Sequence, residues 1–97
     1  MKFEWDSAKD RSNQQRHGLS FTEAQQLFES GGEYVEIYDS EHSDVEDRFI
    51  AVGTIDRGIA VVVYTETEEG FIRIIGARLA SKRERDLYRE RVIGTDE

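Results

Sequence analysis

The chain has 97 residues, 35% of them charged, with no cysteine and a formal net charge of −8. This length predicts one domain spanning residues 1–97, and the missing cysteines exclude disulfides and thiolate metal sites. No apolar run reaches the length of a signal peptide or a membrane span, so we expect a soluble cytoplasmic protein whose acidity repels nucleic acid at long range.

The first predicted helix begins after Asp6, a suitable N-cap, and runs to about His17, where Gly18 fits a left-handed C-cap. Residues three or four apart share a helix face. Here that face holds only polar side chains: Asp6, Lys9, Asn13 and His17. Because an amphipathic helix would place apolar residues there, packing alone does not explain the order.

A second helix is predicted from the capping box Ser20-Phe-Thr-Glu23 to about Glu29, with Gly31-Gly32 as its end. Its apolar residues recur at helical spacing, which places them in the core. They are Phe21, Ala24, Leu27 and Phe28.

The pattern then changes to the alternation of strands. The expected strands lie around 33–39, 47–55, 59–66 and 70–79, with tight connections at 56–58 and 66–70. Neighbouring hairpins predict an antiparallel meander of three or four strands, in which the apolar run Ile59 to Tyr64 is central. The capping box Ser81-Lys-Arg-Glu84 opens a last helix through about Arg91, followed by a fraying tail to Glu97. The fold class is therefore α+β.

Strict alternation in the last strand divides its residues between two faces. One face receives Phe71, Arg73, Ile75 and Ala77, and the other Ile72, Ile74, Gly76 and Arg78. A charge within such a strand needs an open face or an acidic partner, for which Glu46 and Asp47 are candidates. Arg73 therefore serves either a structural ion pair or a function.

Charge is segregated along the chain. Residues 22–47 carry nine acids and no Lys or Arg, whereas residues 73–91 carry seven bases and three acids, a local balance of +4. Such a basic segment is either a solvated helix or a surface for an anionic partner.

Three separated blocks resemble the BrnT family. They are F-E-W-D-x-x-K-x-x-x-N-x-x-x-H-G-x-S-F-x-E-A at 3–24, E-D-R-F at 46–49 and R-I-I-G-A-R-x-A-S-K-R-E-R-x-x-Y at 73–88. The resemblance implies a fold like that of RelE-type ribonucleases and a toxin of a bacterial type II toxin-antitoxin pair. It also implies a BrnA-like antitoxin partner with a ribbon-helix-helix fold. The chain departs from the common family pattern by having Arg16 instead of Lys and Gly76 instead of Ser.

The implied chemistry is cleavage of RNA, free or on the ribosome, with no metal or cofactor. The 2′-hydroxyl attacks the 3′-phosphate, so the enzyme must move protons and stabilise the phosphorane. A guanidinium fork suits the phosphorane, which assigns Arg73 and Arg78 to that task. Proton transfer falls to His17, with Glu46 as a further general base. The predicted RNA contacts are Arg48, Lys82, Arg83 and Tyr88.

Other interpretations stay open for individual residues. His17 also suits stabilisation of a helix C-terminus, and Trp5 suits a core anchor. Tyr88 either packs against the sheet or meets a base or proton. The segment Asp39 to Asp47, with His42 among carboxylates, is typical of a solvated loop, although a divalent cation is an alternative.

Two functions are therefore compared. The first is an endoribonuclease toxin that an antitoxin neutralises, which the three motif blocks favour. The second is a non-catalytic module of the same fold that only binds a protein partner, which the net charge of −8 and Gly76 favour.

Overall fold

A five-stranded sheet forms the centre of the protein, which a computed structural model describes over residues 1–31 and 33–92. The strands are β1 (Phe3–Glu4), β2 (Val35–Tyr38), β3 (Phe49–Ile55), β4 (Gly58–Glu66) and β5 (Ile72–Leu79), in the spatial order β1-β5-β4-β3-β2. β2 to β5 form an antiparallel meander, β1 pairs with β5 in parallel, and β4 is therefore the middle strand of the whole sheet. The α+β class and the meander are confirmed. The sequence does not predict β1, because two residues are too few to show alternation.

Three helices surround this sheet: α1 (Ser7–His17), α2 (Phe21–Glu29) and α3 (Lys82–Val92). Their predicted caps are confirmed. The Asp6 carboxylate accepts hydrogen bonds from the backbone of Ala8 and Lys9, and Gly18 ends α1 at a φ of 69°. Both capping boxes form, one opening α2 and one opening α3. The predicted end at Gly32 and the fraying of 93–97 lie outside the described residues.

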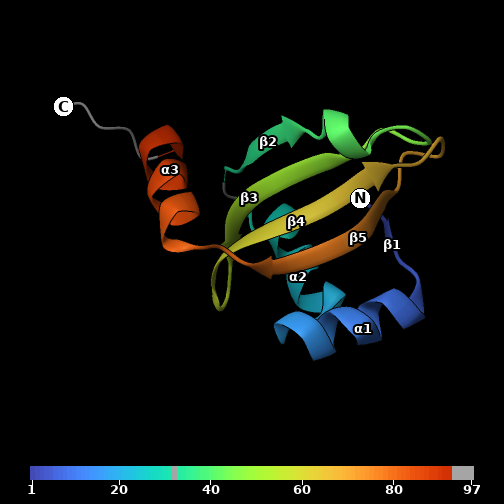
Figure 1. Ribbon diagram of the computed structural model, residues 1–97, viewed down its shortest axis with the longest axis horizontal. Helices are drawn as coiled ribbons and strands as arrows, with labels where there is room; N and C mark the ends of the chain where they lie inside the picture. The colour runs from blue at the N-terminus through green and yellow to red at the C-terminus, as the bar shows by residue number, and fades with distance from the viewer. Residues whose placement is uncertain (32, 93–97) are drawn as a thin grey trace.

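The three helices occupy different places around the sheet. α2 packs across one face, and in Figure 1 α1 lies along the β5 edge while α3 stands at the end where β2 and β3 lie. None of the helices in the described part of the chain has the length and apolar character needed to span a bilayer.

The core lies between α2 and the sheet. Phe21 and Ala24 are fully buried and Leu27 nearly so, as predicted, while Phe28 packs against the cluster with part of its ring exposed. The sheet contributes Ala51, Ile55, Ala60, Val62, Tyr64, Ile72, Ile74 and Ala77. Burial of a side chain as large as Phe21, Leu27 or Ile74 stabilises the fold by about 1.5–3 kcal/mol.

Trp5 follows β1 and packs its ring edge-on against Phe21, with 6.0 Å between ring centroids. It belongs to the partly buried residues around the core, so its interpretation as a core anchor is confirmed.

Candidate functional site

A β-bulge in β5 decides which side chains reach the face of the sheet that α2 leaves uncovered. Val63 pairs with Gly76 and Tyr64 pairs with Ile74, so Ile75 has no partner of its own on β4. The alternation shifts by one at this point, and Ala77 joins the core rather than the face of Arg73. The predicted division of faces was therefore wrong beyond Ile75: Gly76 and Arg78 lie on the face of Arg73, and Ala77 lies on the other. As a result, Arg73 and Arg78 lie on the same face of the sheet.

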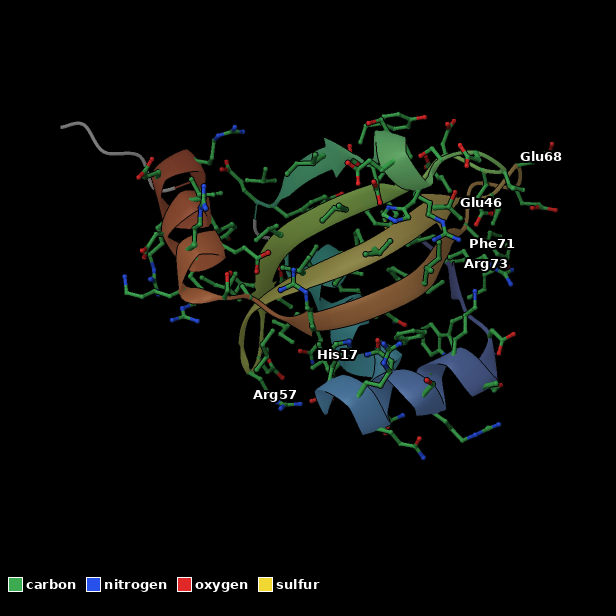
Figure 2. All side chains as sticks on the ribbon, in the orientation of Figure 1. His17, Glu46, Arg57, Glu68, Phe71 and Arg73 are labelled. Carbon is green, nitrogen blue, oxygen red and sulfur yellow. The ribbon has the colours of Figure 1, made fainter. Side chains whose placement is uncertain are left out.

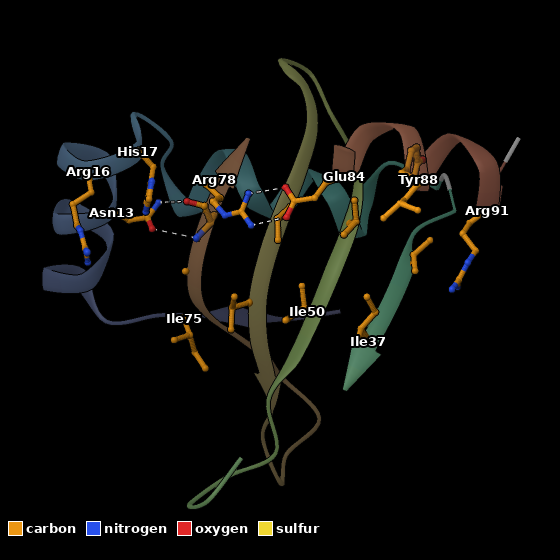
Figure 3. Close-up of a pocket in the computed structure, with 17 residues that line it drawn as sticks. Asn13, Arg16, His17, Ile37, Ile50, Ile75, Arg78, Glu84, Tyr88 and Arg91 are labelled. Carbon is orange, nitrogen blue, oxygen red and sulfur yellow. Dashed lines mark hydrogen bonds and ion pairs between the residues drawn. The ribbon is translucent and has the colours of Figure 1, made fainter. Parts of the chain in front are cut away.

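This uncovered face is named the open face and is defined by Val35, Ile37, Ile50, Val52, Val61, Val63, Ile75, Gly76 and Arg78. A groove of about 600 Å³ lies over it. One wall is the C-terminal half of α1, and the other is the inner side of α3, as Figure 3 shows. The walls add Asn13, Arg16, His17, Glu84, Leu87, Tyr88 and Arg91.

Asn13 attaches α1 to the sheet. Its hydrogen bonds explain why a polar residue lies on the face of this helix that meets the sheet. Its side-chain amide donates to the carbonyls of Leu19 and Ala77, both at 2.8 Å, and its oxygen accepts from the Ala77 backbone at 3.1 Å. Asn13 is also the one buried residue of α1. The helix therefore docks through hydrogen bonds to backbone groups and not through an apolar stripe.

His17 lies one turn beyond Asn13 and lines the same groove as Arg78, the residue after Ala77. Within residues 1–31 and 33–92, the imidazole forms no hydrogen bond or ion pair with another side chain. Its ring is exposed to the groove, as Figure 3 shows, so it is free to meet a ligand there.

Arg78 is held by a carboxylate from the opposite wall. Two of its guanidinium nitrogens donate to the two oxygens of Glu84, each at 2.8 Å. This fork is the main reason that the pKa of Glu84 falls to about 2, and the backbone N–H of Ser81 lowers it further. A bidentate carboxylate occupies the two donors that would otherwise fit two phosphate oxygens. An anion that takes the place of this fork on Arg78 must displace Glu84.

Arg73 lies at the other end of β5 in different surroundings. It pairs with Glu4 of β1 at 2.7 Å, and not with the predicted Glu46 or Asp47. The recess around Arg73 contains two cations, four carboxylates and two threonines. They are Lys9, Arg73, Glu46, Asp47, Glu66, Glu68, Thr65 and Thr67. Figure 2 shows Arg73 and Glu46 together, far along the sheet from His17.

Arg78 lies five positions after Arg73, which on a strand of about 3.3 Å per residue separates their Cα atoms by roughly 15 Å. The two guanidinium groups are held in different recesses, one by Glu4 and the other by Glu84. The structure therefore brings together two of the four predicted catalytic residues, His17 and Arg78, and separates them from Arg73 and Glu46.

The predicted RNA contacts lie in three different settings. Lys82 and Arg83 are exposed at the start of α3, and Lys82 pairs with Asp86 at 3.0 Å. Arg48 lies beside Glu46 at 3.7 Å, at the Arg73 end. Tyr88 is buried, and its hydroxyl lies 3.1 Å from Thr54 and donates to the Glu33 carbonyl. Tyr88 thus attaches α3 to the sheet.

The loop around His42 forms a short 3₁₀ turn, Ser40–His42. The imidazole Nδ1 lies 2.9 Å from the Asp39 carboxylate, and the side chain is largely exposed. No group of three or more potential metal-ligating side chains is assembled within residues 1–31 and 33–92. The arrangement matches the interpretation as a solvated connection between strands.

Sequence reasoning did not identify several residues of the groove. The sequence assigns Glu84 only to a capping box. Its contact with Arg78 could not be predicted, because it depends on where α3 lies relative to β5. The walls also contain Arg16, Leu87 and Arg91. Their helical positions gave no sign that they face the sheet, because both helices are predominantly polar.

Comparison with known proteins agrees with this fold. Residues 5–84 match the model of a family described as the ribonuclease toxin, BrnT, of type II toxin-antitoxin systems. The ribonuclease toxin BrnT of Brucella abortus has a similar structure, with a TM-score of 0.61 and 24% sequence identity, over 84% of this chain and 99% of that one. No curated protein matches the chain. Since the family model covers most of the chain, the protein belongs to the BrnT family of ribonuclease toxins of type II toxin-antitoxin systems.

Proposed function

We propose that the protein is an endoribonuclease that cleaves RNA without a metal ion, through attack by the 2′-hydroxyl. The observation that carries this proposal is the meeting of Arg78 and His17 at one end of the groove. The charged groups of the groove, Arg16, Arg78, Arg91 and Glu84, leave a positive balance there in an otherwise acidic molecule. A positive hollow attracts a phosphate locally even when the net charge opposes approach.

The reaction needs two proton transfers and one site for negative charge. The 2′-oxygen loses its proton and bonds to phosphorus, while the bond from phosphorus to the 5′-oxygen breaks and that oxygen is protonated. The products are a 2′,3′-cyclic phosphate and a 5′-hydroxyl. Arg78, once Glu84 has moved away, donates two hydrogen bonds to the phosphorane. His17 moves a proton, since the two ring nitrogens of an imidazole can accept a proton and donate one.

Among the other predicted contacts, Lys82 and Arg83 are exposed at the start of the helix that carries Glu84, which supports a role in binding RNA backbone. Tyr88 is unsuited to stacking on a base while its ring is buried. Arg73, Glu46 and Arg48 lie outside the proposed centre, and their roles in cleavage remain predictions.

Family membership implies an antitoxin partner. We propose that this partner is a BrnA-like protein with a ribbon-helix-helix fold, that the toxin fold is RelE-like, and that both proteins act in the cytoplasm. Expression of the chain alone should then slow bacterial growth, and co-expression of the antitoxin encoded beside it should restore growth. Unimpaired growth at verified high expression would favour the non-catalytic module.

The direct test is cleavage of a defined RNA by the purified chain in the presence of EDTA. We expect cleavage to persist, to leave cyclic phosphate and 5′-hydroxyl ends, and to stop when the cleaved nucleotide is replaced by its 2′-deoxy form. Loss of cleavage on adding EDTA would contradict metal independence. Cleavage of the 2′-deoxy substrate would contradict attack by the 2′-hydroxyl.

The non-catalytic module remains a second candidate because of one observation. Most of the groove floor is aliphatic, which suits a protein partner better than a nucleic acid.

A further inference from the structure

The floor of the groove is an exposed apolar surface. It consists of aliphatic side chains from β2, β3, β4 and β5, and it continues onto Leu87 of α3. Ile37 and Leu87 are 51% and 52% exposed, although large apolar side chains are normally covered. A contiguous apolar surface between polar walls is typical of a binding surface.

The chemistry of this floor favours protein over RNA. Proteins that bind single-stranded RNA use aromatic rings on which bases stack. Here the one aromatic side chain of the groove is Tyr88, which is buried and bonded through its hydroxyl to Thr54 and Glu33. Branched aliphatic side chains offer a base no comparable partner, but they pack well against leucine or isoleucine.

The charged side chains at the rim of the groove favour a negatively charged ligand. Arg16 on α1 and Arg91 on α3 face the groove from opposite walls. Within the described residues, neither guanidinium forms an ion pair. Carboxylates on both flanks of an apolar segment would complement these two cations.

The dimensions and hydrogen bonding favour a helix. Four strands about 4.8 Å apart span roughly 14 Å, while a helix with its side chains is about 10–12 Å wide. β3 and β4 have strands on both sides, so the middle of the floor offers no free backbone edge to an extended peptide, and the edge strand β2 lies only at the side of the floor. A helix satisfies its own backbone hydrogen bonds and can lay an apolar face on such a floor.

We propose that this groove seats an acidic amphipathic helix of the antitoxin, with leucine-like side chains on the sheet and carboxylates toward Arg16 and Arg91. This proposal rests on the antitoxin partnership of the proposed function. A helix placed there would also cover Arg78 and His17, so it would neutralise the toxin by excluding RNA.

The test measures binding of the co-encoded antitoxin to purified variants of the full chain. Ile37→Lys and Leu87→Lys each place a charge on the apolar surface at a half-exposed position, so the fold should survive. We expect each to weaken antitoxin binding by about tenfold or more, the scale of a central interface residue. The matched control is Val45→Lys, at a position that is 98% exposed and outside the groove, and it should change nothing.

The rim is tested by charge reversal. Arg16→Glu and Arg91→Glu should each weaken binding severalfold and more strongly at low salt, whereas Arg11→Glu, exposed on the same helix as Arg16 but outside the groove, should not. A photo-crosslinking amino acid at position 87 should attach to a helical antitoxin segment rich in Asp and Glu. RNA cleavage by each variant is measured separately, so a failed nuclease proposal remains distinguishable from a failed docking proposal.

Unchanged antitoxin affinity in folded Ile37→Lys and Leu87→Lys would overturn the proposal. So would the absence of a complex with the wild-type chain, or crosslinks to a basic or extended segment. Loss of RNA binding with full antitoxin binding in the same variants would assign the groove to RNA. A wild-type dimer that Ile37→Lys abolishes, with antitoxin binding retained, would assign it to a second copy of the chain.

Discussion

The two ends of β5 each carry an arginine on the open face, yet their surroundings are opposite. Arg78 lies in a hollow with a positive balance of charge, across from His17. Arg73 pairs with Glu4 in a recess with twice as many carboxylates as cations. A guanidinium alone therefore does not make a phosphate site. The charges that the fold gathers around it decide whether an anion is attracted.

The two residues proposed to transfer protons, His17 and Glu46, lie at opposite ends of β5. Replacing His17 should have the largest effect on the rate of RNA cleavage. His17→Ala should lower RNA cleavage by about 10²–10⁴, the usual contribution of general acid-base catalysis. Glu46→Gln, at the Arg73 end, should cost less than about tenfold. Single-turnover rates measured beside thermal melts check this. Equal losses for both variants would remove the distinction between the ends, and undiminished cleavage by folded His17→Ala would leave only its role at the helix C-terminus.

The Arg78 end depends on the attachment of α1 to β5. Asn13→Ala leaves the Ala77 N–H and two carbonyls without these partners in a buried place, and we expect a loss of about 2–3 kcal/mol in the free energy of unfolding. Gln15→Ala removes an exposed amide from the same helix and should cost less than about 0.5 kcal/mol. Urea titrations measure both. A loss of the same small size for Asn13→Ala would mean that packing, not these bonds, positions α1.

Low pH should lower the free energy of unfolding, because it protonates Glu84 and breaks the ion pair with Arg78. The pKa of this carboxyl is about 2 in the folded protein, against 4.5 in its ordinary state, mainly because of Arg78. A lowered folded pKa contributes stability that is complete above about pH 4.5 and is lost as the pH falls toward 2. Glu84→Gln should therefore destabilise the protein at pH 6, and this difference should shrink toward pH 2.5. Both side chains are partly solvated, so the effect should be smaller than that of Asn13→Ala. A difference independent of pH would contradict the role of this ion pair.

The smallest expected change in cleavage rate at the Arg78 end comes from a substitution of Gly76. A Cβ added there meets no atom within 4 Å, so Gly76→Ser should fold normally and place a hydroxyl beside Arg78. One added hydrogen bond to the phosphate should raise cleavage by about two- to tenfold. Gly53→Ser is the matched control for strain, because its Cβ would lie 2.8 Å from that of Tyr34. Its melting temperature should fall, whereas that of Gly76→Ser should not. A lower melting temperature for Gly76→Ser would show that this part of the groove is not open.

Local signals predicted most of the fold. Capping residues such as Asp6, Ser20 and Ser81 marked the helix starts, and alternation marked the meander. The division of faces in β5 was not predictable, because the bulge at Ile75 depends on pairing with β4. The candidate site was predictable as a set of residue types. The sequence did not show which of these residues lie together. Their contacts join separate helices and strands, as in the pairs Asn13 with Ala77, Arg73 with Glu4 and Arg78 with Glu84.

The placement of the chemistry is tested most directly by RNA cleavage rates of Arg78→Ala and Arg73→Ala, measured side by side with EDTA present and a melt for each variant. If the centre lies at the Arg78 end, Arg78→Ala should lose about 10²–10³ in rate, and Arg73→Ala less than about tenfold. Arg78→Lys should recover only part of the loss, because an ammonium lacks the bidentate fork. Undiminished cleavage by folded Arg78→Ala, or a larger loss in Arg73→Ala, would contradict this placement.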